Sequence, residues 1–359
     1  MKDNEIEIIE IDDIEELEKP KKKVKKGAII TFIVLDFLAV LGLFFTYGPI
    51  DYFRNYWVTT AMRTQSHKYL ARIFYSSDTI QEIMANNCVL EINDSTNVND
   101  IVFGSNEDPG VYESIYEEQI LKRDSNNNDY KIIDISGTDH GMKYRGYLVA
   151  IYDPSRVELA TAKKLGVIGQ RLREITKDNN AILGINASGF IDRNEQGMGG
   201  EPTGIIIKDG KFIWGSNDVT TMAGFNKDNV LVLKKETPKQ AVAEGIRDAV
   251  DFGPFLIING QSAIVKGNGG WGYNPRTVLA QRKDGIVLFM VIDGRQPGYS
   301  IGISIPEVIK ILTRYRAHNA VNMDGGASSA LVVNNELYSK PCAYNETGER
   351  WLPDAWILK

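Results

Sequence analysis

The pattern of hydrophobic and polar positions divides the chain into a helical first part and a strand-rich second part. The first part contains an apolar run over residues 28–47, which only Asp36 interrupts. Twenty helical residues extend about 30 Å, which is the thickness of the hydrocarbon core of a bilayer. We therefore predict a single transmembrane helix over 28–47. A cleavable signal peptide is the alternative, although its apolar core is usually shorter and ends in small residues.

Basic residues beside this run indicate its orientation. Six lysines lie between positions 19 and 26, and the cytoplasmic flanks of membrane helices carry an excess of Lys and Arg. We predict a single-pass protein of the plasma membrane, with residues 1–27 as a cytoplasmic tail and the rest of the chain extracellular. Residues 1–18 carry nine acids and one lysine. This charge density predicts a solvated tail, with a partner-binding amphipathic helix as the alternative.

The segment 48–143 combines a helical stretch with polar loops. Apolar positions recur at near-helical intervals from 51 to 85 without an intervening proline, and 86–130 is rich in asparagine. These patterns are typical of helices and of loops joining short elements, respectively. The sequence therefore predicts an extracellular stalk or adaptor over 48–143.

Short β-rich runs separated by glycine occupy residues 144–359. A hairpin with an Asp-Gly turn is predicted over 204–214, and further strands are predicted at 146–152, 181–186, 230–233, 255–258, 278–281, 286–292, 319–323 and 330–333. Few helical patterns interrupt these strands. The predicted fold class is α+β: a mixed β-sheet domain with few helices, preceded by a single transmembrane helix and a helical stalk.

Composition and charge narrow the possible partners. Of the 33 glycines, 28 lie between Gly137 and Gly348, so tight turns and close backbone approaches concentrate in the strand-rich domain. The formal net charge is −6, residues 27–359 hold only −4 of it, and they contain no basic block. Nucleic acid is therefore excluded as the main partner. The chain has two cysteines, Cys88 and Cys342, which are too few for a disulfide scaffold. We predict that they are unpaired, with a single disulfide between them as the alternative.

Candidate chemistry begins with a predicted strand–helix–strand unit over residues 286–326. The two apolar strands end in Asp293-Gly294-Arg295 and in Asp324-Gly325-Gly326, and Ser304 is a suitable cap for the helix between them. Strands joined by a crossover helix usually lie parallel as neighbours. Asp293 and Asp324 are then expected at the same carboxyl edge, where open sheets place their ligands.

Each Asp-Gly pair alone is compatible with a simple turn. Together, with Arg295 beside one pair and Ser328 and Ser329 after the other, they indicate a functional site. The Gly325-Gly326 amides and the serine hydroxyls could bind a phosphate.

Two further loops add candidates of the same character. Asn186-Ala187-Ser188-Gly189 follows a buried strand directly, and Asn274-Pro275-Arg276 precedes another strand. The planar guanidinium of Arg276 suits phosphate or carboxylate, although a surface salt bridge is the alternative. Glu201 is a third acid, in a glycine-rich turn.

The order of these motifs resembles the phosphodiester glycosidase family. The motifs are Asn-x-x-Gly-Phe at 186–190, Asn-Pro-Arg-Thr at 274–277, Asp-Gly-Arg at 293–295 and Asn-Met-Asp-Gly-Gly-x-Ser at 322–328. The resemblance covers roughly residues 145–359 and is to bacterial, membrane-anchored members associated with exopolysaccharide. It implies an extracellular hydrolase of the bacterial plasma membrane that acts on a sugar phosphodiester or a surface glycan.

The implied reaction breaks the bond between an anomeric carbon and a phosphate oxygen. A phosphate is already a good leaving group, so the reaction needs a cation at the phosphate and a carboxylate near the oxocarbenium-like centre. The expected catalytic residues are Asp293, Asp324, Arg276 and Arg295. The expected substrate-binding residues are Asn186, Ser188, Gly189, Glu201, Asn274, Gly325, Gly326, Ser328 and Ser329.

Other readings of the same residues stay open. No cofactor and no metal ligand is assigned, although the two aspartates could hold a divalent cation. Transfer of a glycosyl or phosphoglycosyl group to a surface polymer is the alternative reaction, and a non-enzymatic glycan-binding envelope protein is the alternative function. The sugar, the aglycone and the stereochemical course are not specified by the sequence.

Overall fold

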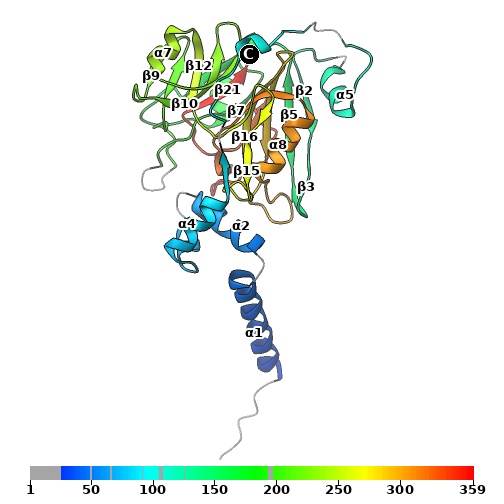
Figure 1. Ribbon diagram of the computed structural model, residues 1–359, viewed down its shortest axis with the longest axis vertical. Coiled ribbons are helices and arrows are strands. Elements are labelled where there is room, and N and C mark those ends of the chain that lie inside the picture. The colour runs from blue at the N-terminus through cyan, green and yellow to red at the C-terminus, as the bar shows by residue number, and fades with distance from the viewer. Residues whose placement is uncertain are drawn as a thin grey trace, which may run out of the picture. The chain divides into compact units, whose positions relative to one another are not determined.

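The computed structural model describes residues 26–48, 51–64, 67–90, 92–104, 108–124, 126–192 and 197–359 (Figure 1). The chain forms two compact units, Met1–Asp51 and Tyr52–Lys359. Residues 1–25, which contain the predicted acidic tail and all but one of the lysines after it, lie outside the described residues.

The helix predicted over 28–47 forms, but it does not qualify as a membrane span. Helix α1 covers Lys26–Tyr47. Within the described ranges, no helix combines the length and the apolar character that a crossing requires. This finding overturns the predicted transmembrane helix and the single-pass plasma-membrane localisation that rested on it, and it gives no support to the membrane as a partner.

The second unit is built around a seven-stranded sheet. Figure 1 labels β16, β5 and β2 of this sheet within the second unit, and every pairing between its strands is antiparallel. In spatial order the strands are β14 (Gln261–Ser262), β13 (Phe255–Ile258), β18 (Ala317–Asn322), β16 (Arg276–Arg282), β17 (Val287–Ile292), β5 (Gly146–Ile151) and β2 (Tyr130–Asp134).

Both faces of this sheet are covered, which explains why β17 is apolar at every position. Helix α8 (Ile305–Arg314) packs on one face, with Val308, Ile311 and Leu312 fully buried. Burying each such side chain contributes about 1.5–3 kcal/mol. The predicted cap is confirmed, because the Ser304 hydroxyl accepts from the Glu307 N–H. Alternate residues of the same strands, such as Phe289, face a second core that the other two large sheets share.

Two five-stranded sheets cover the opposite face. The first has the order β11 (Leu231–Glu236), β10 (Thr220–Asn226), β12 (Ile246–Asp251), β8 (Ile206–Lys208) and β9 (Lys211–Trp214), with α7 (Pro238–Ala243) beside it. The second has the order β20 (Glu336–Leu337), β19 (Leu331–Val333), β7 (Leu183–Asn186), β21 (Asp354–Leu358) and β6 (Val157–Thr161), with α6 (Leu172–Asp178) against it. The predicted hairpin at 204–214 is confirmed as β8–β9.

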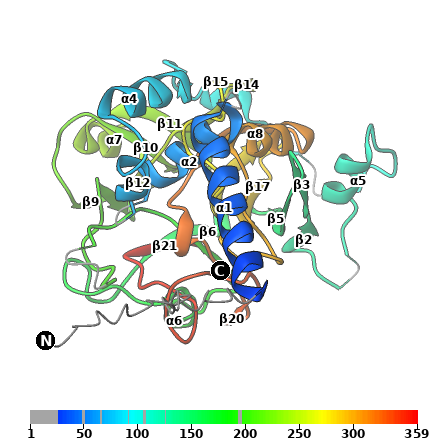
Figure 2. The ribbon, with the colours of Figure 1, turned by 90° about the horizontal axis from the view of Figure 1, so that it is seen from below.

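Residues before 144 contribute directly to this unit. Helices α2 (Asp51–Met62), α3 (Tyr69–Arg72) and α4 (Ser77–Asn86) lead into β1 (Cys88–Leu90), which pairs with β15 (Ile264–Lys266). Figures 1 and 2 show α2 and α4 at the end of the unit near β15. The hairpin β3–β4 (Gly137–Asp139, Met142–Tyr144) follows β2. The segment assigned to a stalk thus supplies strands and helices to the same compact unit.

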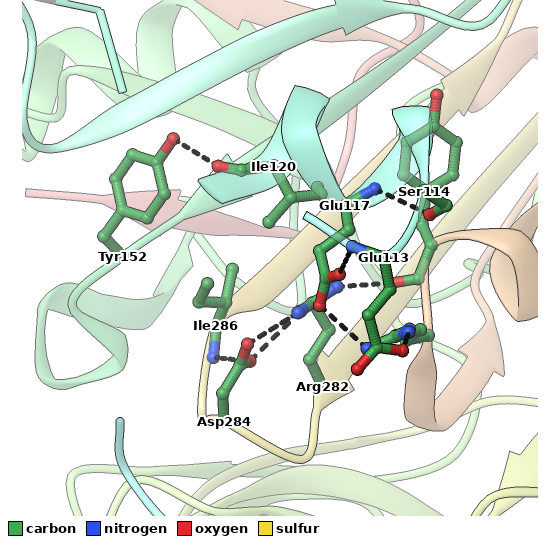
Figure 3. A network of polar contacts seen from close by, with 10 residues as sticks. Glu113, Ser114, Glu117, Ile120, Tyr152, Arg282, Asp284 and Ile286 are labelled. Atoms are coloured by element: carbon green, nitrogen blue, oxygen red, sulfur yellow. Dashed lines mark hydrogen bonds and ion pairs between the residues drawn. The ribbon is translucent and has the colours of Figure 1, made fainter. Parts of the chain in front are cut away.

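Helix α5 (Ile115–Leu121) is fastened to the sheet by polar contacts (Figure 3). Ser114 caps it at the Glu117 N–H, and the Tyr152 hydroxyl donates to the Ile120 carbonyl at 2.9 Å. At the end of β16, Arg282 forms an ion pair with Asp284 at 2.7 Å. This end of β16 is therefore a charge-balanced structural region.

Candidate active site

The ends of five strands bring the candidate residues to one edge of the unit. Asp293 follows β17, Asp324 follows β18, and Arg276 begins β16. Asn186 ends β7 and Asp354 begins β21, its antiparallel neighbour. The Asp324 N–H donates to the Ala187 carbonyl at 3.1 Å, which joins the strand ends of the two sheets.

The two predicted strands share a direction but are not neighbours. Strand β16 lies between β17 and β18 and is antiparallel to both. The reason is local: β16 and β17 are joined by a four-residue turn and pair as a hairpin, so β18 adds to the free side of β16. The expectation that Asp293 and Asp324 share an edge holds, and the start of β16 with Arg276 lies between them.

Arg276 is buried without a carboxylate to balance its charge. Its side chain is 2% exposed, and its Nη2 donates to the carbonyls of Trp271 at 2.9 Å and Gly272 at 2.7 Å. Its Nε has no partner among the described residues, and no described acid forms an ion pair with it. Burial lowers the Arg276 pKa to about 9, helped by the nearby charges of Arg295 and Arg63. An uncompensated buried guanidinium is expensive unless an anion binds it.

Arg295 is held beside the glycine motif. Its Nε and Nη2 donate to the Asn274 Oδ1 at 3.0 and 2.9 Å. A Cβ on Gly326 would lie 3.0 Å from Arg295 Nη2, and the Gly326 φ of +63° also favours glycine. Asn274 itself is fixed, because its Nδ2 donates to the Trp271 carbonyl at 2.7 Å. Asn274 is thus a positioning residue for the exposed guanidinium of Arg295.

Asp324 is the partly exposed carboxyl at this edge. Its side chain is half-buried, and its Oδ1 accepts from the Gly325 N–H at 3.0 Å. Burial raises the Asp324 pKa to about 6, although the Ser328 hydroxyl, the Gly325 N–H and the charges of Arg350 and Arg295 oppose the shift. A carboxyl titrating near 6 can exchange a proton close to neutral pH.

Asp293 has a different environment. It is 1% exposed, and its carboxylate accepts from the Lys340 N–H at 3.0 Å and from the Tyr299 hydroxyl at 2.9 Å. Burial raises its pKa, and these two hydrogen bonds oppose the shift. These contacts connect the end of β17 to residue 340. Asp293 therefore stabilises the arrangement of the strand ends.

Asn186 and Ser188 are engaged with the protein itself. The Asn186 Nδ2 donates to the Asp324 carbonyl at 2.7 Å, and its Oδ1 accepts from the Thr277 hydroxyl at 2.7 Å. The Ser188 hydroxyl and N–H donate to the two oxygens of Asp354 at 2.6 and 2.8 Å. Both residues lie at the predicted edge, and their described contacts position the acids around them.

Asp354 is a site residue that the sequence did not predict. It is fully buried, and burial raises its pKa to about 6 despite the two Ser188 hydrogen bonds, with the Asp324 charge adding to the shift. The signal in the sequence is weak, because Asp354 only precedes a short apolar run and carries no glycine beside it. Its role follows from the pairing of β21 with β7, which local patterns do not encode.

Replacing Asp354 with asparagine should stabilise the protein at high pH. A folded-state pKa of about 6, above the unfolded value of about 3.9, gives stability that is present below pH 4 and lost as the pH rises to 6. Asn can keep both Ser188 contacts without the charge, because its Oδ1 can accept from the Ser188 N–H and its Nδ2 can donate to the Ser188 hydroxyl oxygen. We expect D354N to exceed the wild type by about 2–3 kcal/mol at pH 8 and to match it near pH 4. Urea unfolding at both pH values measures this.

The exposed Asp228 provides the control for this pH dependence. D228N should follow the wild-type curve at both pH values, because an exposed carboxyl loses little solvation on folding. A D354N protein that is less stable than the wild type at pH 8 would contradict the assignment.

A cavity of about 200 Å³ lies beside Gly189. It is lined by Thr203, Gly204, Asp251, Phe252, Gly253 and Trp271. A Cβ on Gly189 would meet the Thr203 hydroxyl at 2.8 Å and the Phe252 ring at 3.1 Å, so glycine keeps this loop close to the cavity wall. Trp271 connects the cavity with the carbonyl that holds Arg276.

The remaining candidates lie around this edge. The Ser329 hydroxyl is buried without a described partner. Gly325 packs against the Pro275 carbonyl, and the Gly326 N–H donates to that carbonyl at 3.1 Å. The Glu201 carbonyl accepts from the Ile191 N–H, which places Glu201 in the loop facing the end of Phe190. In the described part of the chain, no three His, Cys, Asp or Glu side chains are grouped to hold a metal ion, and both cysteines are free thiols.

Comparisons with known proteins agree with this architecture. The sequence model of the phosphodiester glycosidase family matches residues 179–359. The SPbeta prophage-derived uncharacterized protein YomE of Bacillus subtilis (strain 168) is 25% identical over 195 residues, 51% of this chain and 28% of that protein. The chain thus matches little more than a quarter of the length of that relative.

Among solved structures, the unit is similar to the catalytic domain of zebrafish N-acetylglucosamine-1-phosphodiester alpha-N-acetylglucosaminidase, auto-inhibited by pro-peptide. The TM-score is 0.54 at 21% identity, over 64% of this chain and 82% of the zebrafish chain. At this level of identity the likeness concerns the fold.

Proposed function

The chain belongs to the phosphodiester glycosidase family, and from that premise we propose that its strand-end site hydrolyses the bond between a sugar anomeric carbon and a phosphodiester oxygen. Sugar phosphodiesters are the substrates that the family implies. The unpaired, buried guanidinium of Arg276 is the observation that carries the proposal, because only an anionic ligand would balance it.

We assign the phosphate to Arg276 and Arg295. Both guanidinium groups lie near the Asp324-Gly325-Gly326 turn: a Cβ on Gly325 would lie 3.9 Å from Arg276 Nη1, and one on Gly326 would lie 3.0 Å from Arg295 Nη2. The two glycines let the turn approach the Pro275 carbonyl and the Arg295 guanidinium closely. Fixed donors that face a leaving phosphate stabilise the charge that develops on it as the glycosidic bond breaks.

We assign the proton transfer to Asp324. With a pKa of about 6 its carboxyl is ionised at neutral pH and can accept the proton of the water that attacks the anomeric carbon. Asp293 takes the role of a positioning residue, because Lys340 and Tyr299 occupy its oxygens. Asn186 positions Asp324 through its hydrogen bond to the Asp324 carbonyl, and Ser188 positions the Asp354 carboxylate. The family's association with exopolysaccharide supports an envelope glycan as the source of the substrate.

Product analysis on the full chain tests the proposal. The protein is incubated with a panel of sugar 1-phosphodiesters, including methyl esters of sugar 1-phosphates and UDP-sugars, with and without an acceptor polysaccharide. We expect free sugar and a phosphate monoester, with no dependence on the acceptor. Products attached to the acceptor would instead indicate transfer. Binding to polysaccharide without turnover of any phosphodiester would reject the hydrolase and favour a glycan-binding protein.

A further inference from the structure

A third arginine reaches the same site from the N-terminal helices. Arg63 directly follows α2, and its Nε donates to the Gly270 carbonyl at 3.0 Å. Its guanidinium carbon lies 4.3 Å from the centre of the Trp271 ring, and that of Arg276 lies 5.9 Å from the same centre. The two guanidinium groups therefore flank one aromatic side chain that also lines the cavity beside Gly189.

Close packing and hydrogen bonds between the N-terminal helical segment and the loop 267–273 fix the position of Arg63. A Cβ on Gly272 would lie 1.9 Å from the Thr60 hydroxyl, so only glycine permits this approach. The Asn87 Oδ1 accepts from the Asn268 N–H at 2.9 Å, and the Asn268 Nδ2 donates to the Thr59 hydroxyl at 3.0 Å. The loop 267–273, whose carbonyls accept from Arg276, is thus held in place by contacts with the segment that contains Arg63.

No direct ion pair between described residues balances the charge of this cluster. Arg63, Arg276 and Arg295 form no ion pair with any acid in the described ranges. By contrast, Arg282 at the other end of β16 is paired with Asp284. Arg276 is buried, whereas Arg63 and Arg295 are exposed to solvent. An anion that contacts all three guanidinium groups would balance the buried charge and reduce their mutual repulsion. A phosphodiester has one negative charge, whereas a diphosphate diester has two and offers two phosphates to the planar forks.

We propose that Arg63 is a further anion-binding residue, which makes the site selective for a sugar joined to a diphosphate over a sugar joined to a single phosphate. Arg276 and Arg295 hold the phosphate next to the sugar, and Arg63 holds the outer phosphate. Arg63 lies outside the matched family region, residues 179–359, so this extension belongs to the N-terminal segment of this chain. The substrate class rests on the proposed function, whereas the anion site can be tested without turnover.

Calorimetric titration of the full chain with inorganic pyrophosphate and with inorganic phosphate tests the anion site. We expect the wild type to prefer pyrophosphate, and R63Q to weaken pyrophosphate at least tenfold while phosphate changes less than threefold. R63K should recover part of the pyrophosphate affinity because it retains the charge. R72Q, which removes an exposed arginine from α3 of the same segment, is the matched control and should bind as the wild type does. Thermal unfolding confirms that each variant is folded.

Kinetics then address the substrate class. In R63Q, the ratio of kcat/KM for a UDP-sugar to kcat/KM for the methyl phosphodiester of the same sugar should fall about tenfold. Comparison of the UDP-sugar with a prenyl diphosphate sugar shows whether the group beyond the outer phosphate is a nucleotide or a lipid. Unchanged pyrophosphate binding in R63Q, or an equal loss of both anions, would overturn the proposal. If the anions behave as expected but no sugar phosphodiester is cleaved, the proposed reaction fails and the anion site stands.

Discussion

Replacing Asp324 with asparagine should lower kcat on a sugar phosphodiester by about 10²–10⁴-fold, the usual contribution of a general acid or base. The amide has nearly the shape of the carboxyl and can still accept from the Gly325 N–H, but it cannot take a proton from water. In the wild type, kcat/KM should rise with pH through about 6, because the active form is the ionised carboxylate and is lost as the pH falls through its pKa. Steady-state rates across pH 4.5–8.5 measure both effects.

The matched control for Asp324 is Asp248. It lies in β12, is 1% exposed, and has a pKa that burial also raises, but its Oδ1 accepts from the Asp209 N–H away from the strand-end site. D248N should therefore retain the wild-type rate and pH profile. Asp324 would lose its assignment if D324N kept turnover within tenfold of the wild type while D293N abolished it without loss of stability.

Replacing Arg276 with glutamine should lower kcat/KM by about 10²–10³-fold, because a fixed donor to the developing phosphate charge is worth that much in a preorganised site. The same change should not lower stability through the charge. The buried guanidinium has a depressed pKa, which means that the folded state disfavours its charged form. Relief of the buried charge is opposed by the loss of the hydrogen bonds to the Trp271 and Gly272 carbonyls. The melting temperature of R276Q should therefore fall less than that of R282Q, while its activity falls far more.

Arg282 gives the matched control within the same strand. It is also buried, at the far end of β16, but its charge is paired with Asp284 and it donates to the Tyr315 carbonyl. R282Q should lower the free energy of unfolding by about 1–3 kcal/mol, because the partner groups lose their donors. Its kcat/KM should stay within a few-fold of the wild type. Equal losses of activity in R276Q and R282Q would show that Arg276 acts only through folding.

Much of the fold could be predicted from local patterns. The run 286–292 is apolar at every position because both faces of β17 are covered, and the turn at Asp209-Gly210 closes the predicted β8–β9 hairpin. Strands β10, β12 and β21 escaped prediction, since their sequences mix small and polar residues or are short. The apolar run over 28–47 predicted a helix correctly and a membrane span wrongly, because no helix in the described residues combines the length and the apolar character that a crossing requires.

By itself, the sequence determined which residues stand at strand ends: Asp293, Asp324, Asn186 and Arg276 each adjoin an apolar run, and that placement depends only on periodicity and turn residues a few positions apart. The tertiary structure decided what each of them can do. Strand order placed β16 between β17 and β18, the Lys340 and Tyr299 contacts occupied Asp293, and the pairing of β21 with β7 added Asp354. Charge balance and burial depend on residues far apart in the chain, so only the folded protein shows that Arg276 has no acid beside it and that Arg63 reaches the same ring.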